Sequence, residues 1–373
     1  MNDLSRSGSQ FKTLAYADPQ FESYLRGTFS SHQLAVPIRT LNVRSQKEEV
    51  TFEVVNRKDV ERPSMLIVLL KLLRPQTLTL SVGTMIVSFV AAEKFKLPLD
   101  FTLSVLTILA VLFFHAAINL LNDFYDHMKG HDRINPQGGS RAIQRAWIPA
   151  HFVQKLGLFF LILSFLAGIP VLILHSSIVI VLAALSALAG LEFSTHRLGL
   201  KNLGLGEYLV FLLTGPFLTC GFVWATSGLF HRQMILLGFV FGFVTLFFYH
   251  VSNIENILVD AHADRRTWAV FIGIDRAKKL LWVIAGLITL SYFAFAISYC
   301  VPDWQSGHSL LLEEQKGLVI FLAMYAVIAI NMILICVRTG QLHSPLSSEL
   351  ESIRHRSLRL HWLTVICMII AMA

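Results

Sequence analysis

Residues 101–132 read FTLSVLTILAVLFFHAAINLLNDFYDHMKGHD. The stretch carries no charged side chain before Asp123, so its apolar part is long enough to cross a bilayer as a helix. If the helix continues, Asn119, Asp123 and Asp126 follow one another at four and three residues and share one face. The stretch therefore predicts a membrane-spanning helix that ends in a stripe of oxygen ligands, with Asp132 just beyond it.

The whole chain shares this apolar character. Of its 373 residues, 54% are hydrophobic and 15% are charged, whereas roughly 25% are charged in soluble domains. An ordinary soluble enzyme is therefore excluded. The net charge of +7 does not indicate nucleic acid as a partner, because membrane proteins retain Lys and Arg on their cytoplasmic side. The composition predicts an all-α integral membrane protein whose partner is the lipid bilayer.

Nine segments are long and apolar enough to span a membrane. They are residues 75–93, 101–121, 152–174, 176–194, 207–228, 233–253, 280–300, 317–337 and 357–373. We therefore expect residues 64–373 to form one polytopic domain, a nine-transmembrane-helix bundle. Residues 1–63 are polar and are expected to be an N-terminal tail or a small accessory segment, with one β-like run at Val50–Val55.

The loops between these segments carry unequal charge. With a cytoplasmic N-terminus, the loops on the opposite side hold Lys94, Lys96, Arg232 and Lys316, while the cytoplasmic loops hold many more Lys and Arg residues. This asymmetry is the one expected of inner-membrane topology. We therefore expect a multi-pass protein, of a bacterial inner membrane, whose N-terminus and polar loops face the cytoplasm.

A second polar stripe lies at the cytoplasmic end of another predicted helix. Asn253, Asn256, Asp260 and Asp264 are spaced by three, four and four residues. Carboxylates on one face repel each other unless a cation holds them, and Mg²⁺ often bridges such carboxylates to substrate phosphates. The two stripes predict a diphosphate–Mg²⁺ site. The alternative is two solvated helix ends, which the position of Asn119 inside an apolar segment disfavours.

Basic residues accompany both stripes. Lys129 follows the first stripe, and Arg141 flanks a Gly-Gly turn whose backbone N–H groups could face an anion. A plain cytoplasmic loop would look similar. Lys201 could reach a phosphate as a point charge, or extend its side chain from the membrane interface to water. Glu207 follows at the start of the next predicted helix, where an acid indicates a specific role.

Three blocks of the chain resemble motifs of the UbiA-type intramembrane prenyltransferases, in particular the dihydroxynaphthoate prenyltransferases of menaquinone synthesis. The resemblance runs from Arg74-Pro75 to the ninth predicted helix. The blocks are Asn119-x-x-Asn122-Asp123-x-x-Asp126-x-x-x-x-x-Asp132 followed by Gly-Gly-Ser-Arg-x-Ile-Gln144, Leu200-Lys-x-x-Gly-Leu-Gly-Glu207 with Gly215-Pro216, and Asn253-x-x-Asn256-x-x-x-Asp260 followed by Arg266-Thr267. The third block departs from the pattern: Glu255-Asn256 stands where Arg-Asp is expected, and Asp264 where Gly is usual.

The resemblance implies an active site that opens to the cytoplasm and laterally to lipid. Diphosphate would leave an allylic polyprenyl diphosphate with help from Mg²⁺, an electron-rich aromatic acceptor would attack the allyl cation, and a proton would be lost. By resemblance, Asp123, Asp126 and Asp260 are catalytic metal ligands assisted by Asn119, Asn122 and Asn256, Asp132 and Asp264 are further metal ligands, and Asn253, Lys129, Arg141 and Lys201 bind substrate.

Three alternatives stay open at this stage. The acceptor could be another one used in the family, such as hydroxybenzoate, homogentisate, a tetrapyrrole or a glycerol phosphate. Intramembrane polar residues also mark ion paths in transporters and channels, although here the acids gather at one side. The departure at Glu255-Asn256 raises a third interpretation, a degenerate family member without activity.

Overall fold

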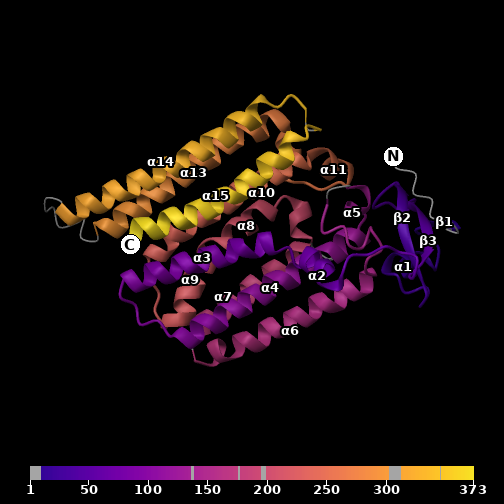
Figure 1. Ribbon diagram of the computed structural model, residues 1–373, viewed down its shortest axis with the longest axis horizontal. Helices are drawn as coiled ribbons and strands as arrows, with labels where there is room; N and C mark the ends of the chain where they lie inside the picture. Colours follow the sequence, from indigo (N-terminus) through magenta and orange to yellow (C-terminus); the bar gives the residue numbers. More distant parts are fainter. Residues whose placement is uncertain (1–9, 136–137, 175–176, 195–198, 302–311, 345) are drawn as a thin grey trace.

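Long helices make up most of the molecule (Figure 1). The computed structural model describes residues 10–135, 138–174, 177–194, 199–301, 312–344 and 346–373. The long helices are α3 (Pro75–Lys94), α4 (Phe101–Met128), α6 (Ala150–Leu174), α7 (Ser177–Ser194), α10 (Gln233–Glu255), α13 (Ile274–Cys300), α14 (Leu312–Gln341) and α15 (Glu349–Met372). The shorter ones are α2 (Met65–Leu73), α5 (His131–Ile134), the 3₁₀ turn η1 (Leu200–Leu203), α8 (Gly206–Thr214), α9 (Pro216–Ser227), α11 (Ile257–His262) and α12 (Trp268–Ile272).

Seven helical segments in the described part of the chain are long and apolar enough to cross a membrane. They are α3, α4, α6, the consecutive α8 and α9, α10, α13 and residues 315–341 of α14. Residues 177–194 and 357–372 of the predicted segments 176–194 and 357–373 lie in α7 and α15, which are helical but are not among the seven; residue 176 lies outside the described residues. The helical membrane part of the prediction is confirmed, while the count of nine spans stays a prediction.

Helix α10 lies at the centre of the bundle. It packs against α8, α9, α13 and α15, and its Phe241, Val244 and Phe247 side chains are fully buried. Figure 1 shows α13, α14 and α15 along one flank and the pair α4 and α6 along the other. The polar ends of α4 and α10 are thereby brought to the same end of the molecule.

The helix predicted over residues 207–228 is broken into α8 and α9 at Gly215-Pro216. Proline disrupts a helix interior because it lacks the N–H group and its ring clashes with the preceding turn. The break brings the backbone against α10: a Cβ atom on Gly215 would lie 2.4 Å from the carbonyl oxygen of Gly238, and one on Gly238 would lie 2.5 Å from the Cα atom of Pro216. Glycines at this crossing therefore permit backbone contact.

Residues 10–56 add a small antiparallel sheet at one end of the bundle (Figure 1). Its strand order is β1 (Gln10–Ala15), β3 (Glu49–Asn56) and β2 (Gln33–Leu41), and α1 (Phe21–Arg26) connects β1 to β2. The β-like run Val50–Val55 is confirmed as part of β3. Val50 and Phe52 are fully buried and pack against Phe21 and Leu25 of α1. The all-α prediction did not include this sheet.

We expect Gly238→Ala to lower the thermal unfolding temperature in detergent, because the new Cβ atom would overlap the backbone at Pro216. Overpacking of this kind typically costs about 1–3 kcal/mol. Gly286→Ala in α13 is the matched control, since a Cβ atom there meets nothing within 4 Å. Equal unfolding temperatures for the two variants would contradict the close packing.

Candidate functional site

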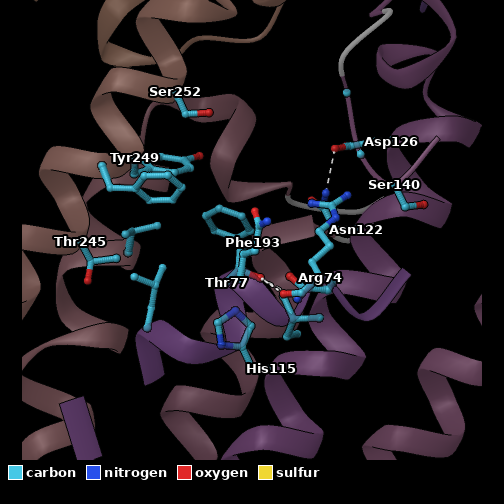
Figure 2. A pocket seen from close by; sticks show the side chains of 18 of the residues that line it. Arg74, Thr77, His115, Asn122, Asp126, Ser140, Phe193, Thr245, Tyr249 and Ser252 are labelled. Carbon is cyan, nitrogen blue, oxygen red and sulfur yellow. Dashed lines mark hydrogen bonds between the residues drawn. The ribbon is translucent and has the colours of Figure 1, made fainter. Parts of the chain in front are cut away.

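A cavity of about 1000 Å³ begins among the loops near the sheet and extends between the helices. Its polar end is lined by Arg74, Asn122, Asp126, His131, Asp132, Asp260 and Arg265, and its apolar part by Val111, Phe114, Phe193, Leu213 and Phe217. Figure 2 shows Tyr249 and Thr245 of α10 on one side and Arg74, Asn122 and Asp126 on the other. The cavity therefore suits a ligand with a charged head and an apolar tail.

Asp123 is held at the break between α2 and α3. Arg74 occupies this break in a left-handed conformation, with φ 51°, directly before Pro75. Residues before proline avoid the right-handed helical region, so the chain turns there and the Arg74 guanidinium forms an ion pair with Asp123. Asn119, one turn earlier on α4, donates to the Leu73 carbonyl and to Thr77 Oγ1, both at 3.0 Å. The polar stripe of α4 thus anchors the α2–α3 break.

Asp126 is held by a lysine from a different part of the chain. Lys201, on η1, is 1% exposed, and its Nζ atom lies 2.7 and 2.8 Å from the two Asp126 carboxylate oxygens. Asn122 contacts both partners. Burial lowers the pKa of Lys201 to about 8, against the opposing effect of Asp126. Lys201 therefore lies behind the cavity wall and pairs with Asp126, which lines the polar end.

The turn at Gly138-Gly139 packs closely against the carboxylates of Asp132 and Asp123. A Cβ atom on Gly139, which has φ +60°, would lie 2.5 Å from Asp132 and 3.0 Å from Asp123. The Ser140 N–H donates to Asp123 at 3.1 Å. Burial, and next the negative charge of Asp126, raise the pKa of Asp132 to about 7. Arg141 donates to the carbonyls of Asp132 and Asn135, so it fixes this loop.

The second polar stripe does not form one continuous face. Helix α10 ends at Glu255, and α11 begins at Ile257 and ends at His262. Asp264 has φ 51° and is exposed beyond the end of α11. The predicted spacing therefore fails for Asp264, because a face argument holds only along an unbroken helix.

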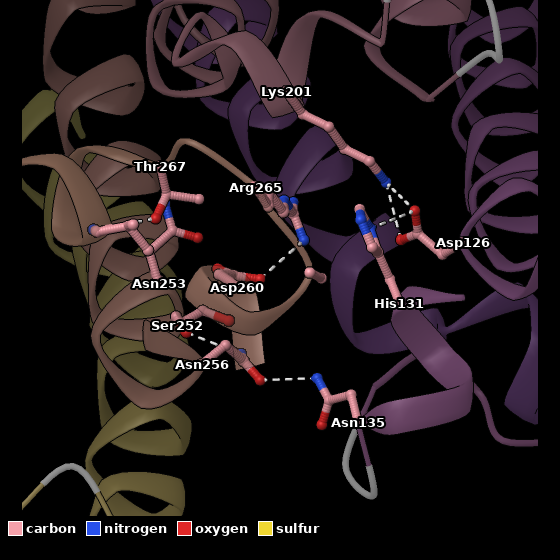
Figure 3. A network of polar contacts seen from close by, with 12 residues as sticks. Asp126, His131, Asn135, Lys201, Ser252, Asn253, Asn256, Asp260, Arg265 and Thr267 are labelled. Atoms are coloured by element: carbon pink, nitrogen blue, oxygen red, sulfur yellow. Dashed lines mark hydrogen bonds and ion pairs between the residues drawn. The ribbon is translucent and has the colours of Figure 1, made fainter. Parts of the chain in front are cut away.

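Asp260, on α11, is the aspartate of this region that lines the cavity. It is 4% exposed, lies 3.5 Å from Arg265, and its Oδ2 atom has no hydrogen-bond partner within the described residues. Arg265 also contacts the Tyr249 hydroxyl at 3.4 Å. Burial raises the pKa of Asp260, and Arg265 opposes this effect. Figure 3 shows Arg265 between Asp260 and the group formed by Asp126, Lys201 and His131.

The asparagines of the second stripe make specific contacts of their own. Asn256 accepts a hydrogen bond from Asn135 at 2.9 Å and donates to the Ser252 carbonyl at 2.8 Å (Figure 3). Asn253 donates to Glu207 at 2.8 Å, and the same Glu207 oxygen accepts from the backbone of Trp268. Asn256 therefore joins the segments that follow α4 and α10, whereas Asn253 fixes α10 to α8.

Six predicted residues do not line the cavity: Asp123, Lys129, Arg141, Lys201, Asn253 and Asp264. Asp123 and Lys201 instead pair with Arg74 and Asp126, which do line it. Lys129 caps the end of α4, with its Nζ atom 6.0 Å from the centre of the Tyr125 ring. Burial, and next the charge of Lys201, lower the pKa of Lys129 to about 8. The structure therefore brings together the first stripe, Lys201, Asn256 and Asp260, and leaves Asp264 outside.

Sequence reasoning missed several residues of this site. Arg74 and Arg265 each pair with a predicted carboxylate. Glu255, expected to alter the second motif, forms a 2.6 Å ion pair with Arg354 of α15, and both line the cavity. The sequence did carry a signal for Arg74, because it stands directly before Pro75 at the start of a predicted helix. Arg354 had none, because it lies near the C-terminal end of the chain, far in sequence from its partner Glu255.

Comparisons with known proteins find relatives of this chain in one family. The model of the UbiA prenyltransferase family matches residues 81–312. The 1,4-dihydroxy-2-naphthoate octaprenyltransferase of Haemophilus influenzae is 27% identical over 237 residues, 61% of this chain and 76% of the relative. The enzyme of that name from Bacillus subtilis is 25% identical over 65% of this chain and 81% of the relative. A solved UbiA homolog from Archaeoglobus fulgidus bound to GPP and Mg²⁺ shares the fold, with TM-score 0.55, 15% identity, and coverage of 81% and 99% of the two chains.

We expect Lys201→Met to destabilise the protein by about 3 kcal/mol, because it leaves the buried Asp126 carboxylate without its ammonium partner. The double variant Lys201→Met/Asp126→Asn should recover part of this loss, since it also removes the charge. Thermal unfolding of the two single variants and the double variant in detergent checks the coupling. Additive effects would contradict a stabilising pair.

Proposed function

Because this chain belongs to the UbiA prenyltransferase family, whose members act in membranes, we propose that it transfers a polyprenyl group from an allylic diphosphate to a dihydroxynaphthoate-like acceptor in quinone biosynthesis. Two relatives named as dihydroxynaphthoate octaprenyltransferases support this acceptor. The observation that carries the proposal is the charged end of an otherwise apolar cavity, where Asp126 and Asp260 come from separate segments. Family membership favours the enzyme over the transporter interpretation.

The residues at the charged end fit Mg²⁺ and a diphosphate. Carboxylate oxygens are the ligands that Mg²⁺ prefers, and Asp260 has a buried oxygen without a hydrogen-bond partner in the described structure. No set of three or more acidic, His or Cys side chains surrounds one point among the described residues. Each Mg²⁺ would therefore be held by only one or two of Asp123, Asp126, Asp132 and Asp260, with water and diphosphate oxygens as its other ligands. When bound, it would neutralise the charge that develops on the leaving diphosphate.

Three cations of the chain would hold the diphosphate. Arg74, Lys201 and Arg265 each pair with a carboxylate at the polar end, so they are positioned where the negative head of the donor arrives. Their charges are fixed in place before the reaction, and such preorganised groups stabilise developing charge without reorganisation. These contacts orient the donor with its scissile C–O bond at the boundary between the polar and apolar parts.

The apolar part of the cavity would receive the prenyl tail and exclude water. Phe114, Phe193 and Phe217 line it. An allyl cation formed there is protected from hydrolysis until the acceptor ring attacks it and loses a proton. We propose that the polar end faces the cytoplasm, because the loops at that end carry most of the Lys and Arg.

A different acceptor of the same family is the second candidate. The apolar part of the cavity is lined mainly by Phe, Leu and Val side chains, and these do not distinguish one aromatic ring from another. We therefore test both together: purified protein in nanodiscs is incubated with Mg²⁺, labelled geranyl diphosphate or a longer donor, and a panel of acceptors. We expect a prenylated dihydroxynaphthoate by mass spectrometry, lost in Asp123→Ala and on chelation with EDTA. A product from another acceptor, or none, would contradict the proposed substrate.

The two acids of the second stripe give a matched pair of variants. We expect Asp260→Asn to lower kcat about 100-fold, because its buried carboxylate would hold Mg²⁺ at the diphosphate. Asp264→Asn should stay within about twofold of wild type, since surface substitutions away from a site have small effects. Initial rates at saturating donor measure both. Equal losses in the two variants would contradict the assignment of Asp260.

A further inference from the structure

The N-terminal sheet is joined to the segment that follows α4 by a buried ion pair. Glu48, at the end of the β2–β3 hairpin, is 4% exposed. It accepts from the Arg133 guanidinium at 2.5 Å and from the backbone N–H of Arg44 at 3.1 Å. The Arg133 side chain is fully buried. Arg133 directly follows Asp132 in the chain, so the pair fixes the position of that carboxylate's segment.

Close packing accompanies this ion pair. Gly130 has φ +90°, and a Cβ atom there would lie 2.7 Å from Val43 of the hairpin. His127 of α4 forms a 3.0 Å hydrogen bond to the carbonyl of Leu25 in α1. The sheet is therefore fitted to the end of α4 at several points.

The same hairpin reaches the segment that follows α11. The Arg44 guanidinium donates to the carbonyl of Ala263 at 3.0 Å and to that of Asp264 at 3.3 Å. These carbonyls directly follow the end of α11, the helix that carries Asp260, and a cation at a helix C-terminus is favourable. Arg44 and Asn42 have φ values of 61° and 50°, which form the tight turn of the hairpin.

We propose that the N-terminal sheet is a clamp that holds the two carboxylate-bearing segments in register, with Arg44 as a positioning residue for donor binding. The sheet lies outside residues 81–312, the part that the family model matches, so this role is additional to the matched region. For its ligand, the clamp rests on the proposed function. The clamp itself does not depend on the proposed function, because it rests on the polar contacts that one short hairpin makes to both segments.

The positions of the two segments matter because Mg²⁺ and diphosphate would be bound between them. Asp132 and Asp260 come from the two clamped segments, and a displacement of about 1 Å at a reacting centre can cost on the order of 100-fold in rate. Without the Arg44 contacts, the start of α11 keeps its link to the other side through Asn256 and Asn135. We therefore expect a weakened site and a folded protein.

The test compares Arg44→Ala with Arg44→Lys and with Lys47→Ala. Lys47 is exposed on the same hairpin, so its removal takes away the same charge at a similar place. Hydrogen–deuterium exchange of residues 257–267 reports the clamp itself. Binding of geranyl thiodiphosphate in the presence of Mg²⁺ reports its consequence, and thermal unfolding reports global stability.

In Arg44→Ala we expect severalfold faster exchange of residues 257–267 and about tenfold weaker binding of the analogue, with an unchanged unfolding temperature. Arg44→Lys should restore part of both, and Lys47→Ala should match wild type. Unchanged exchange, unchanged binding, or equal changes in Arg44→Ala and Lys47→Ala would overturn the clamp. Faster exchange in Arg44→Ala with no analogue binding by wild type would support the clamp and overturn the proposed function instead.

Discussion

The mouth of the cavity depends on one constraint: a carboxylate buried in an apolar bundle needs a cation beside it, because an unpaired buried charge is strongly destabilising. Three such pairs meet this need, Arg74–Asp123, Lys201–Asp126 and Arg265–Asp260. Each cation comes from a non-helical break or a short turn rather than from a long helix. The α2–α3 break, η1 and the segment after α11 are therefore anchored at the site by the charges they carry.

The first stripe could be predicted from the sequence because α4 runs without a break from Phe101 to Met128. Spacing along a single regular helix determines which side chains share a face, and Asn119, Asp123 and Asp126 do gather at the same polar end. The second stripe could not be predicted in this way, because α10 ends before Asn256 and a new axis begins. Helix α11 then ends at His262, between Asp260 and Asp264, so the spacing of these two residues does not place them on one face.

Contacts between residues of different helices or strands also could not be predicted from the sequence. Periodicity relates residues of one helix, but the meeting of Glu255 with Arg354 depends on how α10 packs against α15. The N-terminal sheet shows the same limit. Its strand β3 gave a β-like signal at Val50–Val55, whereas the contact of the Arg44 side chain with the carbonyl of Ala263 follows from how the sheet docks on the bundle.

The departure at Asn256 has a physical consequence for the balance of charge. A neutral amide at this position accepts from Asn135 and donates to the Ser252 carbonyl, and a carboxylate could not make the second contact. A carboxylate there would also add repulsion one turn before Asp260. The chain thus has a hydrogen bond between two segments where the family pattern places a charge. In the proposed mechanism this shifts more of the metal binding to Asp123, Asp126 and Asp132, and leaves Asp260 to complete the site from the opposite side.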